Sequence, residues 1–178
     1  MTRWVATAAA VVALVAPGAC TRNAGMTLRS PAFENDRTIP GQFSCEGDNI
    51  SPPLVWTRVP AEAAELALVV ADPDAPSGTF HHWVVLGIAP KEGRVEAGEL
   101  PPGAVEAKGG SENPTWIGPC PPAGEEHDYV FTLYALDKRL GLPAGADLDA
   151  ALDAVDAARI DGEEATLEGR FGRPEDAP

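Results

Sequence analysis

Several polar residues have types and spacings that suit the binding of a small anion. Asp72 and Asp74 flank a proline directly after an apolar run. His82 opens the next apolar run, and His127 and Tyr129 begin a third. A histidine beside an aspartate donates one ring N–H to the carboxylate, which favours the charged ring and leaves the other nitrogen as an outward donor. Two such histidines and a tyrosine hydroxyl can surround the phosphate group of a larger ligand.

A stiff loop, Gly-Pro-Cys-Pro-Pro at residues 118–122, is expected to complete this cradle. Proline has no N–H, so Gly118 and Cys120 carry the only backbone donors of the loop. Their two N–H groups are predicted to point at the anion. Apolar walls would exclude water, and the candidates are Pro76, Phe80, Trp83 and Trp116. The two tryptophans also fit a packing role.

The elements that must position these residues are predicted to be mainly strands. Apolar runs favour strands over residues 54–56, 65–71, 82–88, 129–136 and 165–171. Asp147 is a candidate cap for one helix, and residues 91–126 are rich in loops. If strands 65–71 and 82–88 pair antiparallel, Asp72 and His82 lie at the same end of the sheet. His127 and Tyr129 join them only if strand 129–136 starts at that end, so the site depends on the strand order.

Length and composition set the class of protein. The 178 residues correspond to one domain, and the 44% of hydrophobic residues suffices for a core. Glycine and proline number 18 each, as expected for short strands and many turns. The net charge is −14, and a field of this sign repels nucleic acid and anionic membrane surfaces. We therefore expect no nucleic-acid partner, and an anion site must act locally against the global charge.

The N-terminus is predicted to direct export. Arg3 precedes an uncharged run of small apolar residues that ends at Pro-Gly-Ala-Cys, with the cysteine at position 20. Small residues before a cysteine resemble a bacterial lipobox, although Pro17 stands where an aliphatic residue is usual. We expect a signal peptide over 1–19, lipidation of Cys20, a tether over 20–25, the domain over 26–173 and a tail over 174–178. The protein would then be a membrane-anchored lipoprotein of the cell envelope. An ordinary signal peptide is the alternative.

Cysteine usage is compatible with export. If Cys20 is lipidated, Cys45 and Cys120 are the two remaining cysteines, in an oxidising compartment. A disulfide between them is one hypothesis, and two buried thiols are the other.

Several motifs, spaced in order along the chain, resemble the phosphatidylethanolamine-binding protein family. The closest similarity is to the bacterial branch of Raf kinase inhibitor-like proteins. The central motifs are Asp-Pro-Asp-Ala-Pro at 72–76, Phe-His-His-Trp at 80–83, and the proline-rich loop followed by His127 and Tyr129. Further matches are Ser-Pro-Ala-Phe at 30–33, Cys-Glu-Gly at 45–47, Ser-Pro-Pro-Leu at 51–54 and Leu-Glu-Gly-Arg-Phe-Gly at 167–172. The resemblance covers nearly all of the expected mature chain.

The resemblance implies a large antiparallel sheet packed on a smaller sheet, with peripheral helices. It also implies a pocket for phosphate, acetate or phospholipid head groups. The matching positions are Asp72, Asp74, Pro76, His82, Gly118, Pro119, His127 and Tyr129. Phe80 stands where the family often has Trp, so the rim of the pocket is expected to differ. The kinase-inhibitor role of eukaryotic members is not carried over, because an exported protein meets no cytosolic kinase.

Three functions follow as hypotheses. The first is non-catalytic binding of a small anion or phosphorylated head group, with no cofactor and no metal, and with affinity rising as the pH falls towards 5.5. The second is inhibition or binding of another exported protein, such as a protease or a receptor. The third is a hydrolase or metal enzyme built on His82, His127 and Asp72. It lacks support from a G-x-S-x-G or H-E-x-x-H motif. Asp72 and Asp74 also fit a purely structural role in a turn.

Overall fold

Long apolar runs that are buried on both faces form the centre of the fold. The computed structural model describes residues 25–111 and 114–176. Within it, β4 (Glu65–Asp72) has every residue buried except Ala71. It pairs antiparallel with β5 (Phe80–Ile88) on one side and with β8 (Glu126–Leu136) on the other. A strand can be apolar on both faces only when another layer covers each face of its sheet.

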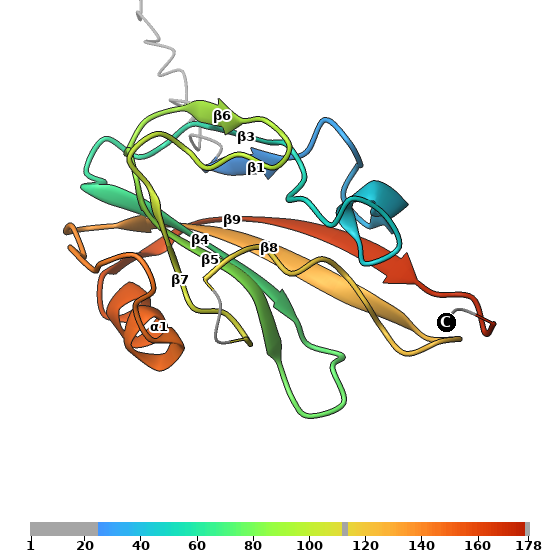
Figure 1. Ribbon diagram of the computed structural model, residues 1–178. Coiled ribbons are helices and arrows are strands. Elements are labelled where there is room, and N and C mark those ends of the chain that lie inside the picture. Colours follow the sequence, from blue (N-terminus) through green and yellow to red (C-terminus); the bar gives the residue numbers. More distant parts are fainter. Residues whose placement is uncertain (1–24, 112–113, 177–178) are drawn as a thin grey trace, which may run out of the picture.

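The described residues form two sheets and one α-helix, stacked as three layers (Figure 1). The large sheet has the order β2-β9-β8-β4-β5-β7, in which β2 is Arg37–Thr38, β7 is Val105–Ala107 and β9 is Arg159–Gly172. All its pairs are antiparallel except β2 with β9. The small sheet is antiparallel and consists of β1 (Thr27–Arg29), β3 (Leu54–Thr57) and β6 (Gly93–Val95). The predicted mainly β class, with a large sheet packed on a smaller one, is confirmed.

The two spaces between the layers hold two hydrophobic cores. Between the sheets, Phe131 and Leu133 of β8 pack with Trp56 of the small sheet. On the other face, Val84 and Leu86 of β5 belong to the core that includes the helix. Each core takes alternate residues of the central strands, because successive side chains point to opposite faces.

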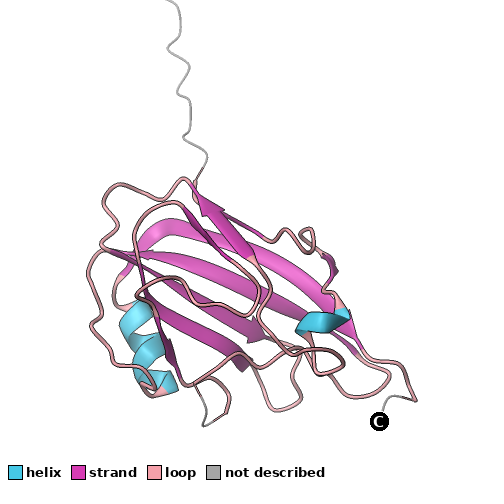
Figure 2. Cartoon of the chain, turned by 45° about the horizontal axis from the view of Figure 1, so that its top comes forward, coloured by secondary structure: helices cyan, strands magenta, loops and turns pink. Residues whose placement is uncertain are grey.

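The single α-helix, α1 (Leu148–Asp156), covers the outer face of the large sheet. Asp147 caps it as predicted, because its side chain accepts from the backbone N–H of Asp149 at 3.1 Å. Ala151 and Val155 are buried against the sheet. A short 3-10 turn, η1 (Gly41–Phe43), lies at the opposite side of the molecule (Figure 2).

The structure extends the predicted strands and adds several short ones. The last strand was expected over residues 165–171, but β9 begins at Arg159. The prediction missed the first part of this strand because its residues are mostly polar and exposed and form no apolar run. The very short strands β1, β2, β6 and β7 were not predicted. Within the described residues, no helix has the length and apolar character needed to cross a membrane. Cys20 and the predicted signal peptide lie outside the described residues.

Candidate functional site

The strand order brings the predicted site residues together. Because β4 lies between β8 and β5, Asp72 at its end has His127 on one side and the start of β5 on the other. His127 and Tyr129 are buried and alternate with the exposed Asp128, so they share the inner face of the sheet. Asp72, His82 and His127 are each about one-twentieth exposed. The expected convergence at one end of the sheet is confirmed.

A β-bulge directs His82 into this site. Val70 pairs with Trp83, whereas the next residue, Ala71, pairs with His81, so His82 is an extra residue in β5. Simple alternation would place His82 and Trp83 on opposite faces, but both are buried on the inner side. A bulge re-aims a side chain in this way. It also leaves His81 on the face that carries the helix, where it lines a different cavity.

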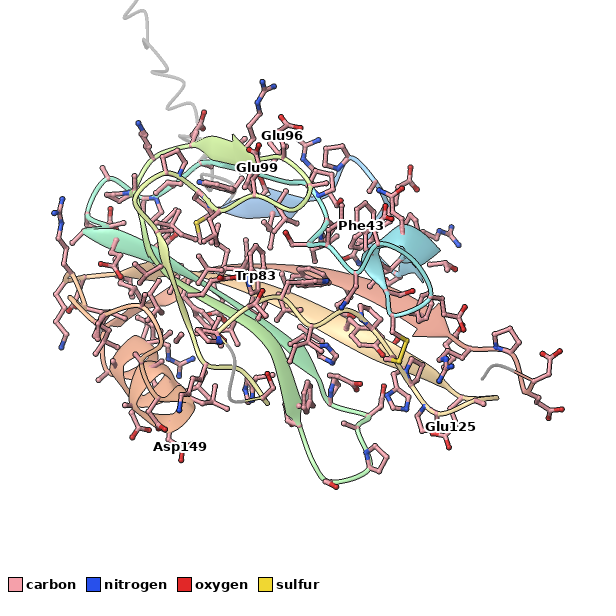
Figure 3. All side chains as sticks on the ribbon, in the orientation of Figure 1. Phe43, Trp83, Glu96, Glu99, Glu125 and Asp149 are labelled. Atoms are coloured by element: carbon pink, nitrogen blue, oxygen red, sulfur yellow. A yellow bond between two sulfur atoms is a disulfide. The ribbon has the colours of Figure 1, made fainter. Side chains whose placement is uncertain are left out.

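Asp72 and His127 form a buried pair. The Nδ1–H of His127 donates to Oδ2 of Asp72 at 2.8 Å, and its Nε2 lies 3.4 Å from Oε2 of Glu125. Figure 3 shows Glu125 at this end of the large sheet, far from Asp149 on the helix. Burial lowers the pKa of His127. The hydrogen bonds to both carboxylates and the nearby negative charges outweigh burial, so this pKa is raised. The site therefore favours the cationic form of His127.

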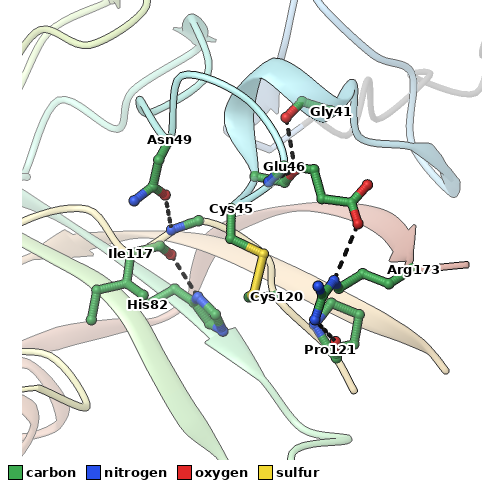
Figure 4. The surroundings of a disulfide bond; sticks show 11 residues. Gly41, Cys45, Glu46, Asn49, His82, Ile117, Cys120, Pro121 and Arg173 are labelled. Atoms are coloured by element: carbon green, nitrogen blue, oxygen red, sulfur yellow. Dashed lines mark hydrogen bonds and ion pairs between the residues drawn. A yellow bond between two sulfur atoms is a disulfide. The ribbon is translucent and has the colours of Figure 1, made fainter. Parts of the chain in front are cut away.

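His82 is held in the opposite state. Its Nδ1–H donates to the backbone carbonyl of Ile117 at 2.6 Å (Figure 4). This bond fixes the tautomer and leaves Nε2, 3.9 Å from Oδ2 of Asp72, with a lone pair and no hydrogen-bond partner. Burial lowers the pKa of the ring and outweighs the raising effects of the Ile117 carbonyl and Asp72. Nε2 of His82 can be the outward donor expected from the sequence only when the ring is charged, and burial opposes that charge.

Tyr129 supplies a buried hydroxyl beside the histidines. Its ring meets His82 edge to face, with 5.1 Å between the ring centroids. Among the described residues the hydroxyl makes no hydrogen bond of good geometry, but the backbone of Cys120 and the carboxylate of Asp72 lie close enough to affect its pKa through weaker hydrogen bonds. Burial, and then the charge of Asp72, raise the pKa of Tyr129, so the phenol keeps its proton and can act as a donor.

These side chains surround a cavity of about 220 Å³. Of the predicted residues, those that line it are Asp72, Pro76, Phe80, His82, Gly118, Cys120 and His127. Ala75, Ile117, Pro121 and Pro122 line it as well. Asp74, Pro119 and Tyr129 stand behind the lining. Trp83 and Trp116 are not walls of this cavity, because they pack against each other between the sheets, edge to face at 5.7 Å.

The proline-rich loop is fixed by bonds that the sequence did not reveal. The N–H of Gly118 donates to Oδ1 of Asn49 at 2.8 Å, so the prediction that it serves the cradle is wrong. Cys120 forms a disulfide with Cys45 (Figure 4). The backbone N–H of Cys45 donates to the carbonyl of Pro119 at 3.1 Å. The hypothesis of a disulfide is thus confirmed, and the alternative of two buried thiols is not. These bonds hold the loop as one wall of the cavity.

Asp74 has the turn role that was considered for it. Its N–H donates to Oδ1 of Asp72, and its own Oδ2 accepts from the N–H of Asp128, each at 2.8 Å. The first bond fixes the carboxylate of Asp72, and the second ties the turn to β8. Three residues that sequence reasoning missed, Asn49, Ile117 and Glu125, position the predicted ones. The roles of Asn49 and Ile117 depend on contacts between distant segments, so no local pattern could have identified them.

The described residues contain no group of three or more His, Cys, Asp or Glu side chains arranged to hold a metal ion. At the site itself, Nδ1 of each histidine is already engaged, one with Asp72 and one with Ile117. The chemistry that the geometry offers is hydrogen bonding by two histidines beside a carboxylate, with a phenol behind them.

Comparisons with known proteins identify relatives of this chain. The sequence model of the phosphatidylethanolamine-binding protein family matches residues 29–171. A curated relative from Mycobacterium tuberculosis, LppC, whose name describes it as a lipoprotein, is 46% identical over 147 residues, which are 82% of this chain and 72% of the relative. A UPF0098 protein of Methanothermobacter thermautotrophicus is 45% identical over 136 residues, covering 74% of this chain and 89% of the relative.

Solved structures show the same fold. The homologue CT736 from Chlamydia trachomatis superposes with a TM-score of 0.77 at 36% identity, covering 84% of this chain and 98% of the other. YbcL of Escherichia coli, described as a member of the mammalian family, also gives a TM-score of 0.77, at 25% identity, with coverages of 84% and 99%. The chain belongs to the phosphatidylethanolamine-binding protein family.

Proposed function

We propose that the protein binds a small anion or the phosphorylated head group of a larger ligand in this cavity, without catalysing a reaction on it. One observation carries the proposal. Nε2 of His82, a side chain that lines the cavity, has no hydrogen-bond partner beside the Asp72–His127 pair. An unpaired buried polar atom costs free energy, so a cavity wall that contains one favours a ligand that pairs with it.

The donors of the site support an anionic ligand. The raised pKa of His127 favours a cationic ring at the wall of the cavity, which attracts an anion. The raised pKa of Tyr129 keeps its phenol protonated behind that wall. Apolar walls from Pro76, Phe80 and Pro122 exclude water and strengthen hydrogen bonds to a charged group. The cavity of about 220 Å³ is small for a complete lipid and suits a head group.

Two further parts of the proposal concern location and partners. We place the protein in the cell envelope, exported by residues 1–19 and anchored through a lipid on Cys20. The lipoprotein name of LppC supports this placement. The rim of the cavity would then face ligands or exported proteins outside the membrane.

An NMR titration of the purified protein tests the binding. Phosphate and O-phosphorylethanolamine are added while the ring resonances of the three histidines are followed. We expect the signals of His82 and His127 to shift together and to saturate, and His82→Ala to lose the response. His81 lies on the other face of the sheet and serves as an internal control. If neither pocket histidine responds at millimolar ligand, anion binding is refuted and a protein partner becomes the leading function.

A further inference from the structure

The disulfide between Cys45 and Cys120 lies at the surface of the molecule. Both cysteines are exposed, and Cys120 is also part of the wall of the cavity. A disulfide opens when a thiolate attacks one of its sulfur atoms, so the thiolate must be able to reach that atom. Exposed disulfides have higher reduction potentials and exchange more readily with thiols than disulfides that serve only as structural links. The position of this bridge therefore suits thiol exchange.

The two loops that the disulfide joins are also held together by hydrogen bonds. The N–H of Cys45 donates to the carbonyl of Pro119 at 3.1 Å, and the N–H of Gly118 donates to Oδ1 of Asn49 at 2.8 Å. Neither bond involves a sulfur atom, so both can persist when the disulfide opens. The wall of the cavity then keeps its place after the exchange.

Arg173, which follows β9, joins the same two loops (Figure 4). Its Nε donates to Oε1 of Glu46 at 3.2 Å, and its Nη1 donates to the carbonyl of Pro121 at 3.4 Å. These two partners directly follow Cys45 and Cys120 in the sequence. Arg173 therefore keeps the two sulfur atoms near each other once the bridge is open. Because groups held in this way react rapidly with each other, the bridge can form again.

A group attached to Cys120 lies where a ligand is expected to bind. The cavity measures about 220 Å³, and Cys120 lines it together with His82 and His127. Cys45 does not line it. A small thiol bound to Cys120 therefore competes with an anion for the same space, whereas the same group on Cys45 leaves the cavity open.

We propose that Cys120 is a site of reversible modification by a low-molecular-weight thiol, and that this modification closes the cavity to anions. The thiolate attacks Sγ of Cys120, and a new S–S bond forms as the bond to Cys45 breaks. Sγ of Cys45 leaves as a thiolate and takes a proton from water. One disulfide replaces another, so the step needs no other oxidant or reductant. Attack by Cys45 on the new bond expels the thiol and restores the bridge.

Mass spectrometry on the folded protein tests the exchange. The purified wild type is incubated with millimolar cysteine without denaturant, the free thiols are then alkylated, and the modified peptides are mapped. We expect a disulfide-linked cysteine on Cys120 and the alkyl group on Cys45. A linked cysteine on Cys45 alone, or a bridge that stays intact, overturns the proposal.

Two matched variants test the closure of the cavity. Cys45→Ser and Cys120→Ser both lack the bridge, and each leaves one of the two thiols for conversion to a cysteine adduct with cystine. Each variant is compared with itself before and after modification, by following the ring resonances of His82 and His127 during a phosphate titration. We expect the adduct to abolish the response of Cys45→Ser. In Cys120→Ser the adduct should change the response little.

The outcomes separate this inference from the proposed function. The closure of the cavity rests on the proposed anion binding, whereas the exchange at the disulfide does not. If the adduct on Cys120 leaves the phosphate response of Cys45→Ser unchanged, closure is overturned and anion binding stands. If the unmodified wild type shows no response to phosphate, anion binding fails and closure fails with it. The mapped peptides still decide whether Cys120 exchanges.

Discussion

At the scale of single residues, Asp72 organises the site. Its Oδ1 accepts from the N–H of Asp74, and its Oδ2 accepts from His127 and lies 3.9 Å from Nε2 of His82. This carboxylate therefore fixes a turn, raises the pKa of one histidine and faces a second. Because Nδ1 of the second histidine is bound to Ile117 instead, the two rings have pKa values shifted in opposite directions in one cavity.

The first prediction concerns this carboxylate. Asp72→Asn removes the charge that pairs with His127 and leaves a charged ring or an unsatisfied one in a buried site. We expect the free energy of unfolding to fall by about 3–5 kcal/mol, the range found when one partner of a buried pair is removed. We also expect the pKa of His127 to fall. Urea unfolding and an NMR titration measure the two effects.

Asp128→Asn is the matched control for that substitution. Asp128 also pairs with a cation, Arg170, at 3.2 Å, but both side chains are about half exposed. Exposed pairs of this kind contribute about 0–1 kcal/mol. If the two variants lose equal stability, the account of Asp72 as the buried partner of His127 is wrong.

The second prediction is a pH dependence. The folded state raises the pKa of His127 above its unfolded value of about 6.5. The stability that this pair contributes is therefore full below about pH 6.5 and disappears as the pH rises through the folded pKa. The groups that face the ring are Asp72, Asp74 and Glu125. The stability lost in His127→Gln should accordingly be larger at about pH 6 than at about pH 8.5.

The contributions of His82 and His81 to stability change with pH in the opposite direction. Burial lowers both pKa values, so each histidine destabilises the fold as the pH falls below about 6.5. His81→Gln, away from the cavity, should therefore improve relative stability on acidification. Urea unfolding at several pH values measures the free energy of unfolding of the wild type, His127→Gln and His81→Gln. A stability loss in His127→Gln that grows with pH would contradict the charged state assigned to His127.

At the scale of elements, two irregular features build the cavity. The bulge in β5 turns His82 inward, and the proline-rich loop closes the opposite wall. Regular strands alternate their side chains and could not put His82 and Trp83 on one face. Prolines at 119, 121 and 122 keep the loop out of the sheets, because they lack the N–H that a ladder requires.

The third prediction tests the closeness of that loop to the rest of the fold. A Cβ at Gly118 would lie 2.4 Å from Oδ1 of Asn49 and 2.5 Å from the carbonyl oxygen of Phe43. Gly118→Ala must therefore displace the loop, and we expect a loss of more than about 1 kcal/mol together with weaker anion binding. Gly41→Ala is the control, since a Cβ there meets nothing within 4 Å. It should be neutral or stabilise by less than about 1 kcal/mol.

The fourth prediction concerns the disulfide, which joins residues 75 positions apart. Replacing Cys45 and Cys120 together by Ala frees this long loop in the unfolded chain, and we expect a loss of about 2–4 kcal/mol. Reductant should lower the melting temperature of the wild type towards that of the double variant. It should leave the double variant itself unchanged. Equal melting temperatures of the wild type with and without reductant would argue against a stabilising bridge.

At the scale of the whole molecule, the two faces of the large sheet contact different layers. One face packs on the small sheet and, at its end, carries the cavity, whereas the other packs on α1. The chain carries a net charge of −14. The field of this charge repels an anion, so its affinity must come from local interactions in the cavity.

The fifth prediction concerns the attachment of the molecule to a membrane. When the full chain is produced in a bacterial host, we expect it in the membrane fraction, released by detergent and retained in high salt. Cys20→Ala should move it to another fraction, because the residue that would carry the lipid is gone. Metabolic labelling with a fatty acid should mark the wild type alone. An unlabelled wild type would refute lipidation.

The central elements could be predicted because their signals are local. The apolar runs of β4, β5 and β8 and the cap at Asp147 depend on neighbouring residues, and each was placed within a few positions. The family motifs also contain Asp72, His82 and His127, which meet at one end of the large sheet. The strands β1, β2, β6 and β7 were missed, because two or three residues carry too little periodicity.

The sequence by itself therefore determined the mainly β fold, the family and the residues that meet at the site. Only the tertiary structure decided their chemical states. The tautomer of His82 depends on the carbonyl of Ile117, the N–H of Gly118 is bonded to Asn49, and the pKa of His127 is raised by Asp72. Each of these bonds joins residues more than thirty positions apart. Local spacing cannot encode them, because a hydrogen bond or a charge acts through distance in space and not along the chain.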